Sequence, residues 1–339
     1  MRTHENVARP LARRTAKAVA AILAGALLAA VTYNTRVEPG ALLVKSVFEA
    51  GREVTPPSDY ASIAATVREH PPVAVRGEKS PEAHLVVVTP RPSSGGPYPI
   101  VLWVHGGGFI SSSAATVKDY AVILAHRGFV VADLDYTIAP AARHPVPVRQ
   151  GSAALAFLRR HGARYGGDPT KIFVGGDSAG AQIASELAAG ETSPTLARAI
   201  GIPTSPPSTA IRGVVLFCGL YDMSTVGQTG FPGLRTYLWA YTGTRNWLRA
   251  PGVEHMSTTA TATGAYPPTF LSVGDADPFR SQETELAAAL RSRAVPVTEL
   301  TWNRSGSGLG HEYQFDFSTP QAGRALERTV AFLDAAAGR

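Results

Sequence analysis

The chain has 339 residues, of which 45% are hydrophobic and 17% charged; this composition excludes a disordered protein and provides for a sizeable core. The formal net charge is +6, but the first 33 residues contain five basic residues and one acidic residue and therefore account for +4 of it. Because no basic stripe with interleaved aromatic residues follows, the charge argues against a nucleic-acid-binding protein. Cys218 is the only cysteine and lies in an apolar run, so we expect a buried structural thiol without a disulfide.

The N-terminus combines a basic tail, residues 1–15, with a nearly uninterrupted apolar segment, residues 16–33. This order is typical of a membrane anchor or an export signal. Cleavage after Ala29 or Ala30 would leave a leucine three positions back, where a small residue is needed, and this favours an uncleaved anchor. The basic flank then predicts a catalytic domain outside the cytoplasm, or a secreted protein if the segment is cleaved. The alternative is a buried N-terminal helix of a cytosolic enzyme.

Residues 34–80 contain several prolines, and we expect a linker with two short cap helices at 40–51 and 59–69. From residue 81 to 337 strands and helices alternate, which predicts one α/β domain with a mostly parallel sheet covered on both faces. The strands are expected at 83–89, 99–104, 129–134, 172–174, 213–217, 269–273 and 297–301, and the helices at 117–127, 148–165, 181–189, 282–293 and 319–337.

Two stretches interrupt this alternation. Residues 191–211 are rich in proline, serine and threonine and predict a surface excursion. Residues 224–266 include an unusual density of aromatic residues, among them Tyr237, Trp239 and Tyr241. We expect a helical cap insertion, whose aromatic residues pack on the core, line a substrate pocket, or do both.

The sequence Gly176-Asp177-Ser178-Ala179-Gly180 stands between an apolar strand and a good helix former. Strand, Gly-x-Ser-x-Gly and helix together are typical of a nucleophile elbow, a tight turn that exposes the serine hydroxyl above a sheet. A serine at neutral pH needs a base to take its proton and an acid to orient that base. Asp177, beside the serine, is interpreted as a turn residue.

On such a sheet the acid and then the histidine follow the serine in the chain. Only His255 and His311 follow Ser178, and His311 comes after the last strand in a glycine-rich loop that can reach over the sheet. The acids at strand ends are Asp222, Asp275 and Asp277. We favour Asp277 because Pro278 fixes the next turn, and expect Asp275 to brace that loop through local hydrogen bonds.

The run His105-Gly106-Gly107-Gly108 ends an earlier strand. Its backbone can approach a ligand closely, so we expect the N–H groups of Gly107 and Gly108, together with Ala179, to form an oxyanion hole. Candidate substrate-binding side chains are Phe109, Tyr237, Trp239 and Tyr241.

Together these motifs resemble the hormone-sensitive lipase branch of the α/β-hydrolase family. The matching positions run from His105 through Asp135-Tyr136, Ala139-Pro140, Pro145 and Pro147 to the elbow, Asp277-Pro278 and His311. The resemblance implies an eight-stranded mixed sheet, a helical cap, and ester hydrolysis by Ser178, Asp277 and His311. The chain departs from the family at Thr137-Ile138, at Glu312-Tyr313 after the histidine, and after Phe217, where the usual Ser-Pro pair is missing.

We therefore expect a serine carboxylesterase that acts on small to medium acyl esters without a cofactor or metal. A deacetylase or peptidase on the same scaffold is the alternative, and a non-catalytic ligand-binding protein or a membrane-tethered interaction module is a more distant one. The sequence leaves open the natural substrate and the oligomeric state.

Overall fold

The computed structural model describes residues 25–26, 31–32, 35–49, 54–91, 96–204, 211–302 and 305–339. The basic tail, residues 1–15, and most of the predicted anchor, residues 16–33, lie outside this part of the chain. Among the described residues, no helix is both long and apolar enough to cross a membrane. The predicted anchor and the location that follows from it stay predictions.

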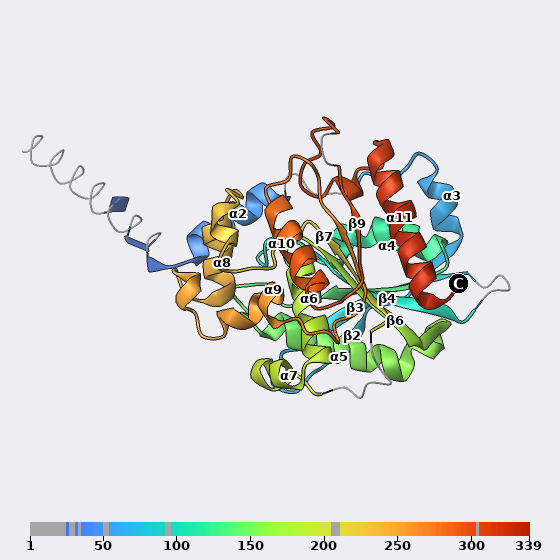
Figure 1. Ribbon diagram of the computed structural model, residues 1–339, viewed down its shortest axis with the longest axis horizontal. Coiled ribbons are helices and arrows are strands. Elements are labelled where there is room, and N and C mark those ends of the chain that lie inside the picture. Colours follow the sequence, from blue (N-terminus) through green and yellow to red (C-terminus); the bar gives the residue numbers. More distant parts are fainter. Residues whose placement is uncertain are drawn as a thin grey trace, which may run out of the picture.

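A single sheet of nine strands forms the centre of the molecule (Figure 1). The path along the sheet is β1-β3-β5-β4-β6-β7-β8-β9, and β2 pairs with β3 beside β1. From β5 to β9 all neighbours are parallel, whereas β3 runs antiparallel to β5. The strands are β1 (Val67–Glu69), β2 (Val73–Val75), β3 (Ala83–Pro90), β4 (Tyr98–Val104), β5 (Val130–Asp135), β6 (Gly167–Asp177), β7 (Gly213–Phe217), β8 (Thr269–Ser272) and β9 (Val297–Leu300).

Helices cover both faces of this sheet, and each face has its own apolar core. On one face lie α3 (Tyr60–Ala65), α4 (Ala114–His126) and α11 (Pro320–Ala337). On the other lie α5 (Val146–His161), α6 (Ala179–Thr192), α7 (Pro194–Ile200) and α10 (Arg280–Arg291). Because helices cover both faces, the central strands are buried on both sides. Their sequences are therefore continuous apolar runs. The α/β fold class predicted from the alternation is confirmed.

A small helical layer lies on the second face and comprises residues 226–261 with α2 (Glu38–Glu49), which packs against α8 (Leu234–Thr242). Its other pieces are short: η3 (Val226–Gln228), η4 (Trp247–Arg249), η5 (Val253–Met256) and α9 (Thr258–Thr261). Elsewhere in the described part of the chain, short turns of helix occur at η1 (Gly162–Tyr165) and η6 (Tyr313–Phe315). The layer combines a segment before the sheet with one inserted between β7 and β8.

The described residues form nine strands where the resemblance implied eight, and one local prediction was wrong. The helix expected at 59–69 ends at Ala65, and residues 67–69 instead pair with the open edge of β3, where Arg68 lies opposite Thr89. The surface excursion expected at 191–211 contains α7. There Ser193 caps the helix by accepting a hydrogen bond from the Leu196 backbone N–H, and Pro194 is the first helical residue. Serine and proline are common in loops, but at these two positions they also favour the start of a helix.

Candidate active site

The turn at Ser178 has the geometry of a strained elbow. Ser178 adopts φ 52° and ψ −119° between the end of β6 and the start of α6, a conformation that non-glycine residues rarely hold. A side chain on Gly180 would place its Cβ 2.0 Å from the Val104 carbonyl oxygen, and one on Gly176 would lie 2.7 Å from the backbone of Gly180. The flanking glycines are therefore required by the close passage of β4 behind the turn.

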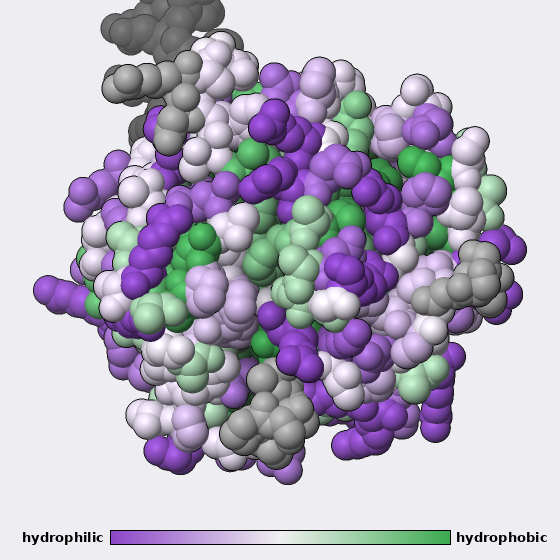
Figure 2. Space-filling view, turned by 45° about the vertical axis from the view of Figure 1, so that its right-hand side comes forward, coloured by the Kyte–Doolittle hydropathy of each residue, from purple (hydrophilic) through white to green (hydrophobic). Residues whose placement is uncertain are grey.

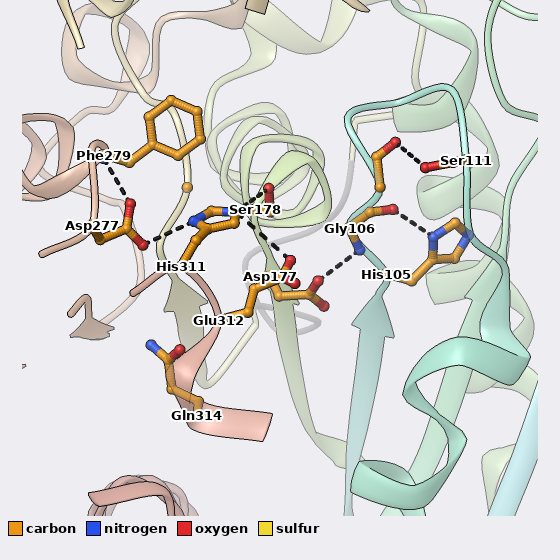
Figure 3. A network of polar contacts seen from close by, with 12 residues as sticks. His105, Gly106, Ser111, Asp177, Ser178, Asp277, Phe279, His311, Glu312 and Gln314 are labelled. Carbon is orange, nitrogen blue, oxygen red and sulfur yellow. Dashed lines mark hydrogen bonds and ion pairs between the residues drawn. The ribbon is translucent and has the colours of Figure 1, made fainter. Parts of the chain in front are cut away.

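The structure brings Ser178, His311 and Asp277 into one hydrogen-bonded series (Figure 3). His311 Nε2 lies 2.9 Å from Ser178 Oγ, and its Nδ1 lies 2.8 Å from Asp277 Oδ2. The other Asp277 oxygen accepts a hydrogen bond of 2.8 Å from the Phe279 backbone N–H. Since the Asp277 side chain is fully buried, this second bond fixes which oxygen faces the imidazole.

The other two acids considered at the strand ends lie elsewhere. Asp222 accepts hydrogen bonds from Ser224 and Thr259, so it closes a turn. Asp275 reaches across to the loop before His311, where it accepts from Ser305 Oγ at 2.8 Å and from the Leu309 N–H at 2.6 Å. These two hydrogen bonds lower the pKa of Asp275, and the bond from Ser305 contributes most. The expected local bracing is therefore corrected: Asp275 joins its own loop to residues 30 and 34 positions later in the chain, Ser305 and Leu309.

Asp177 does more than shape the turn. It is 2% exposed, and its two oxygens accept hydrogen bonds from Trp103 Nε1 at 3.0 Å and from the Gly106 N–H at 2.8 Å. The carboxylate therefore ties the glycine loop after β4 to the residue preceding Ser178. The interpretation of Asp177 as a turn residue missed this link because Trp103 and Gly106 are more than 70 residues away in the chain.

The glycine loop begins close to the elbow, because a Cβ on Gly180 would lie 2.4 Å from the His105 carbonyl oxygen. Gly107 has φ +103° and Gly108 φ +59°, both in the region that favours glycine. The N–H groups of Gly107, Gly108 and Ala179 have no acceptor among the described residues. Tyr136 fixes the base of this loop, because its ring stacks on His105 at 4.3 Å and its hydroxyl donates to the His105 carbonyl.

The candidate substrate-binding aromatics are divided by the structure. Phe109 and Tyr241 stack with ring centres 3.9 Å apart, and a Cβ on Gly108 would lie 3.3 Å from the Tyr237 ring. These three rings are buried next to the glycine loop. Trp239 instead lines a separate cavity with Gly40, Arg235 and Arg245, so the structure does not bring it to Ser178.

Two aromatic neighbours of His311 were missed in the sequence. Phe231 and Phe279 stack on each other at 4.3 Å, and each makes a T-shaped contact with the His311 imidazole, with centroids 4.8 and 5.5 Å from it. Phe279 follows Asp277-Pro278, and this adjacency was the available signal. Phe231 comes from the inserted segment, and no pattern in the sequence singled it out.

Cys218 lies close to Asp277 and His311, which its neighbours in the sequence did not indicate. The thiol is buried, as expected, yet ligand atoms of Cys218, Asp277 and His311 lie within 4.8 Å of one another. Burial, followed by the charge of Asp277, raises the thiol pKa. A neutral thiol in this place is a packing group and a poor metal ligand.

Comparison with known proteins agrees with this geometry. Residues 101–313 match the alpha/beta hydrolase fold family, and the chain belongs to that family. Carboxylesterase NlhH of Mycobacterium tuberculosis is 29% identical over 252 residues, which cover 69% of this chain and 73% of the relative. Esterase LipI of the same organism is 26% identical over 242 residues, covering 66% and 70%.

A solved structure, esterase B from Lactobacillus rhamnosis, superposes with a TM-score of 0.71 at 21% identity and covers 93% of this chain and 95% of that one. This likeness supports the fold. Family and relatives together identify the chain as a carboxylic ester hydrolase, and the predicted membership in the α/β-hydrolase esterases is confirmed.

Proposed function

We propose that the chain is a serine carboxylesterase that hydrolyses small to medium acyl esters through an acyl-serine intermediate. The observation that carries this proposal is the series from Ser178 Oγ through His311 to Asp277, with bonds of 2.9 and 2.8 Å. Each member has the neighbour that its role needs: a base for the nucleophile and an orienting carboxylate for the base.

In the first half of the reaction, Ser178 Oγ attacks the ester carbonyl carbon while His311 Nε2 takes the hydroxyl proton. Asp277 holds the proton on Nδ1 and stabilises the positive charge on the ring. The tetrahedral intermediate carries its negative charge on the former carbonyl oxygen, and we assign its stabilisation to the N–H groups of Gly107, Gly108 and Ala179. His311 then gives its proton to the leaving alcohol oxygen, and the acyl-serine remains.

Water completes the cycle in the same geometry. His311 takes a proton from the water, the resulting hydroxide adds to the acyl carbonyl, and collapse of the second intermediate returns the proton to Ser178 and releases the acid. The start of α6 adds a favourable partial charge near the oxyanion. The tight packing of Phe231, Phe279 and Tyr237 around His311 and Gly108 supports an acyl group of limited size.

The test is active-site labelling with a fluorophosphonate probe, together with hydrolysis of p-nitrophenyl acetate. Ser178→Ala is expected to abolish the label and to lower kcat by several powers of ten, on the order of 10⁴ to 10⁶. Ser292→Ala, at an exposed serine whose hydroxyl bonds only its own helix, is the matched control and should keep both signals. Label or turnover that survives in Ser178→Ala would refute the assignment of the nucleophile.

A further inference from the structure

Glu312, the residue after His311, holds an unusual backbone conformation. Its φ is +62°, in the left-handed region that glycine occupies without cost and a long side chain only with strain. Strained residues persist where the surrounding structure or a function holds them. The question is what the glutamate side chain contributes that a glycine in this place would not.

The carboxylate of Glu312 points into the reaction centre. Glu312 Oε1 lies 3.8 Å from His311 Nε2, the nitrogen that faces Ser178. The same oxygen is 3.0 Å from where a Cβ on Gly106 would stand. The side chain is 12% exposed, and Figure 3 shows it beside Asp177 and His311. A negative charge therefore borders both the general base and the base of the oxyanion loop.

A cavity of about 480 Å³ opens at this point. Its described lining includes three carboxylates, Asp177, Glu312 and Asp316, two aromatic rings, Tyr313 and Phe315, and no lysine or arginine. Phe109, Tyr237 and Tyr241 are not part of this lining, so the cavity lies away from the aromatic rings behind Gly108. Carboxylates together with aromatic faces are the surroundings that favour a positively charged organic group.

The chemistry assigns this cavity to the alcohol portion of the ester. His311 Nε2 delivers its proton to the leaving oxygen, so that oxygen must pass close to Nε2 and hence to Glu312. A negative charge so near the oxyanion opposes the developing negative charge of an uncharged substrate. A cation carried by the alcohol would remove that opposition and be attracted to Glu312.

We propose that Glu312 is a specificity-determining residue that makes the cavity beside His311 a subsite for a cationic leaving alcohol, such as a quaternary or protonated amino alcohol. This inference rests on the proposed serine esterase function. Beyond that function, it specifies that the alcohol portion of the substrate is positively charged and that Glu312 selects it.

The experiment compares two esters of nearly equal shape: acetylcholine and its uncharged isostere, 3,3-dimethylbutyl acetate. The ratio of their kcat/KM values, measured by pH-stat titration, is expected to favour the cation about tenfold in the wild type and to approach one in Glu312→Gln. Glu254→Gln removes the same charge from an exposed position, 68% accessible, and should leave the ratio unchanged. If neither ester is turned over, inhibition of p-nitrophenyl acetate hydrolysis by choline and by 3,3-dimethylbutan-1-ol supplies the same ratio.

A second variant separates specificity from structure. Glu312→Gly fits the positive φ without strain, so its melting temperature should not fall, while its cation preference should be lost as in Glu312→Gln. An unchanged ratio in both variants, or a wild type that prefers the neutral ester, would overturn the inference. The proposed function fails differently, because Ser178→Ala would then still hydrolyse the neutral ester.

Discussion

The ends of the strands and the inserted segment contribute to this site in different ways. At the strand ends, Ser178, Asp277 and the glycine loop are held by backbone constraints and by single hydrogen bonds to buried carboxylates. In the inserted segment, Phe231, Tyr237 and Tyr241 are held by ring packing. A buried hydrogen bond is lost when its donor or acceptor moves, whereas an apolar side chain can be replaced by another of similar volume at little cost in stability. The strand ends therefore define the reaction, and the insertion shapes the space around it.

Among the variants that test this comparison, Gly107→Ala should lower turnover most, because it disturbs the glycine loop at a strand end. The new Cβ would lie 2.3 Å from the Ser111 carbonyl oxygen, at φ +103°, so the loop must shift and one oxyanion donor moves. We expect kcat on p-nitrophenyl acetate to fall about 100- to 1000-fold.

Gly323→Ala is the matched control for that change. Gly323 lies in α11, where an added Cβ meets no atom within 4 Å, and alanine should leave activity unchanged and stabilise the helix by about 0.5–1 kcal/mol. Wild-type turnover in Gly107→Ala would show that this donor is not part of an oxyanion hole.

Tyr241→Leu tests the inserted side and should have a smaller effect on the chemistry. It removes the ring that stacks on Phe109, with an expected loss of about 1–3 kcal/mol in the free energy of unfolding. Turnover of a short acyl ester should change less than tenfold, while the preference among acyl chain lengths shifts. Urea unfolding and a series of p-nitrophenyl esters measure the two quantities. A loss of kcat as large as that of Gly107→Ala would contradict the division between the two regions.

Asp133→Asn tests a buried carboxylate beneath the strand ends and should have the smallest effect on turnover. Asp133 lies in β5 opposite Trp103, is 1% exposed, and neither of its oxygens has a hydrogen-bond partner among the described residues. Burial, and then the charge of Asp177, raises its pKa well above the usual value. The folded state therefore holds a proton that the unfolded state loses, and stability falls as pH rises above the ordinary carboxyl range.

The asparagine variant cannot lose that proton, so its stability should decline less with pH. The difference in unfolding free energy between variant and wild type should grow by up to about 1.4 kcal/mol per pH unit as the pH rises above the ordinary carboxyl range. Urea denaturation at several pH values measures it. Parallel pH curves for the two proteins would mean that Asp133 does not take up a proton on folding.

Much of the site was accessible from the sequence because its signals are local. Strand, glycine, serine, glycine and helix follow one another within a few residues. The order of acid and histidine along the chain pointed to His311, and Pro278 after the acid favoured Asp277; the structure joins both to Ser178. The links that support them were not accessible. Asp177 to Trp103 and Asp275 to Leu309 join residues 74 and 34 positions apart, and no local pattern encodes such pairs.

From residue 83 onward the sequence by itself determined the order of strands and main helices, apart from α7, and it also determined the elbow with His311 and Asp277. These depend on periodicity, on glycine at positions that a side chain would block, and on the turns that end strands. Only the tertiary structure decided which aromatics reach the site, bringing in Phe231 and Phe279 and placing Trp239 elsewhere. It also placed the carboxylate of Glu312 beside His311 Nε2, because the direction of a side chain after a turn depends on a backbone angle that the surrounding chain imposes.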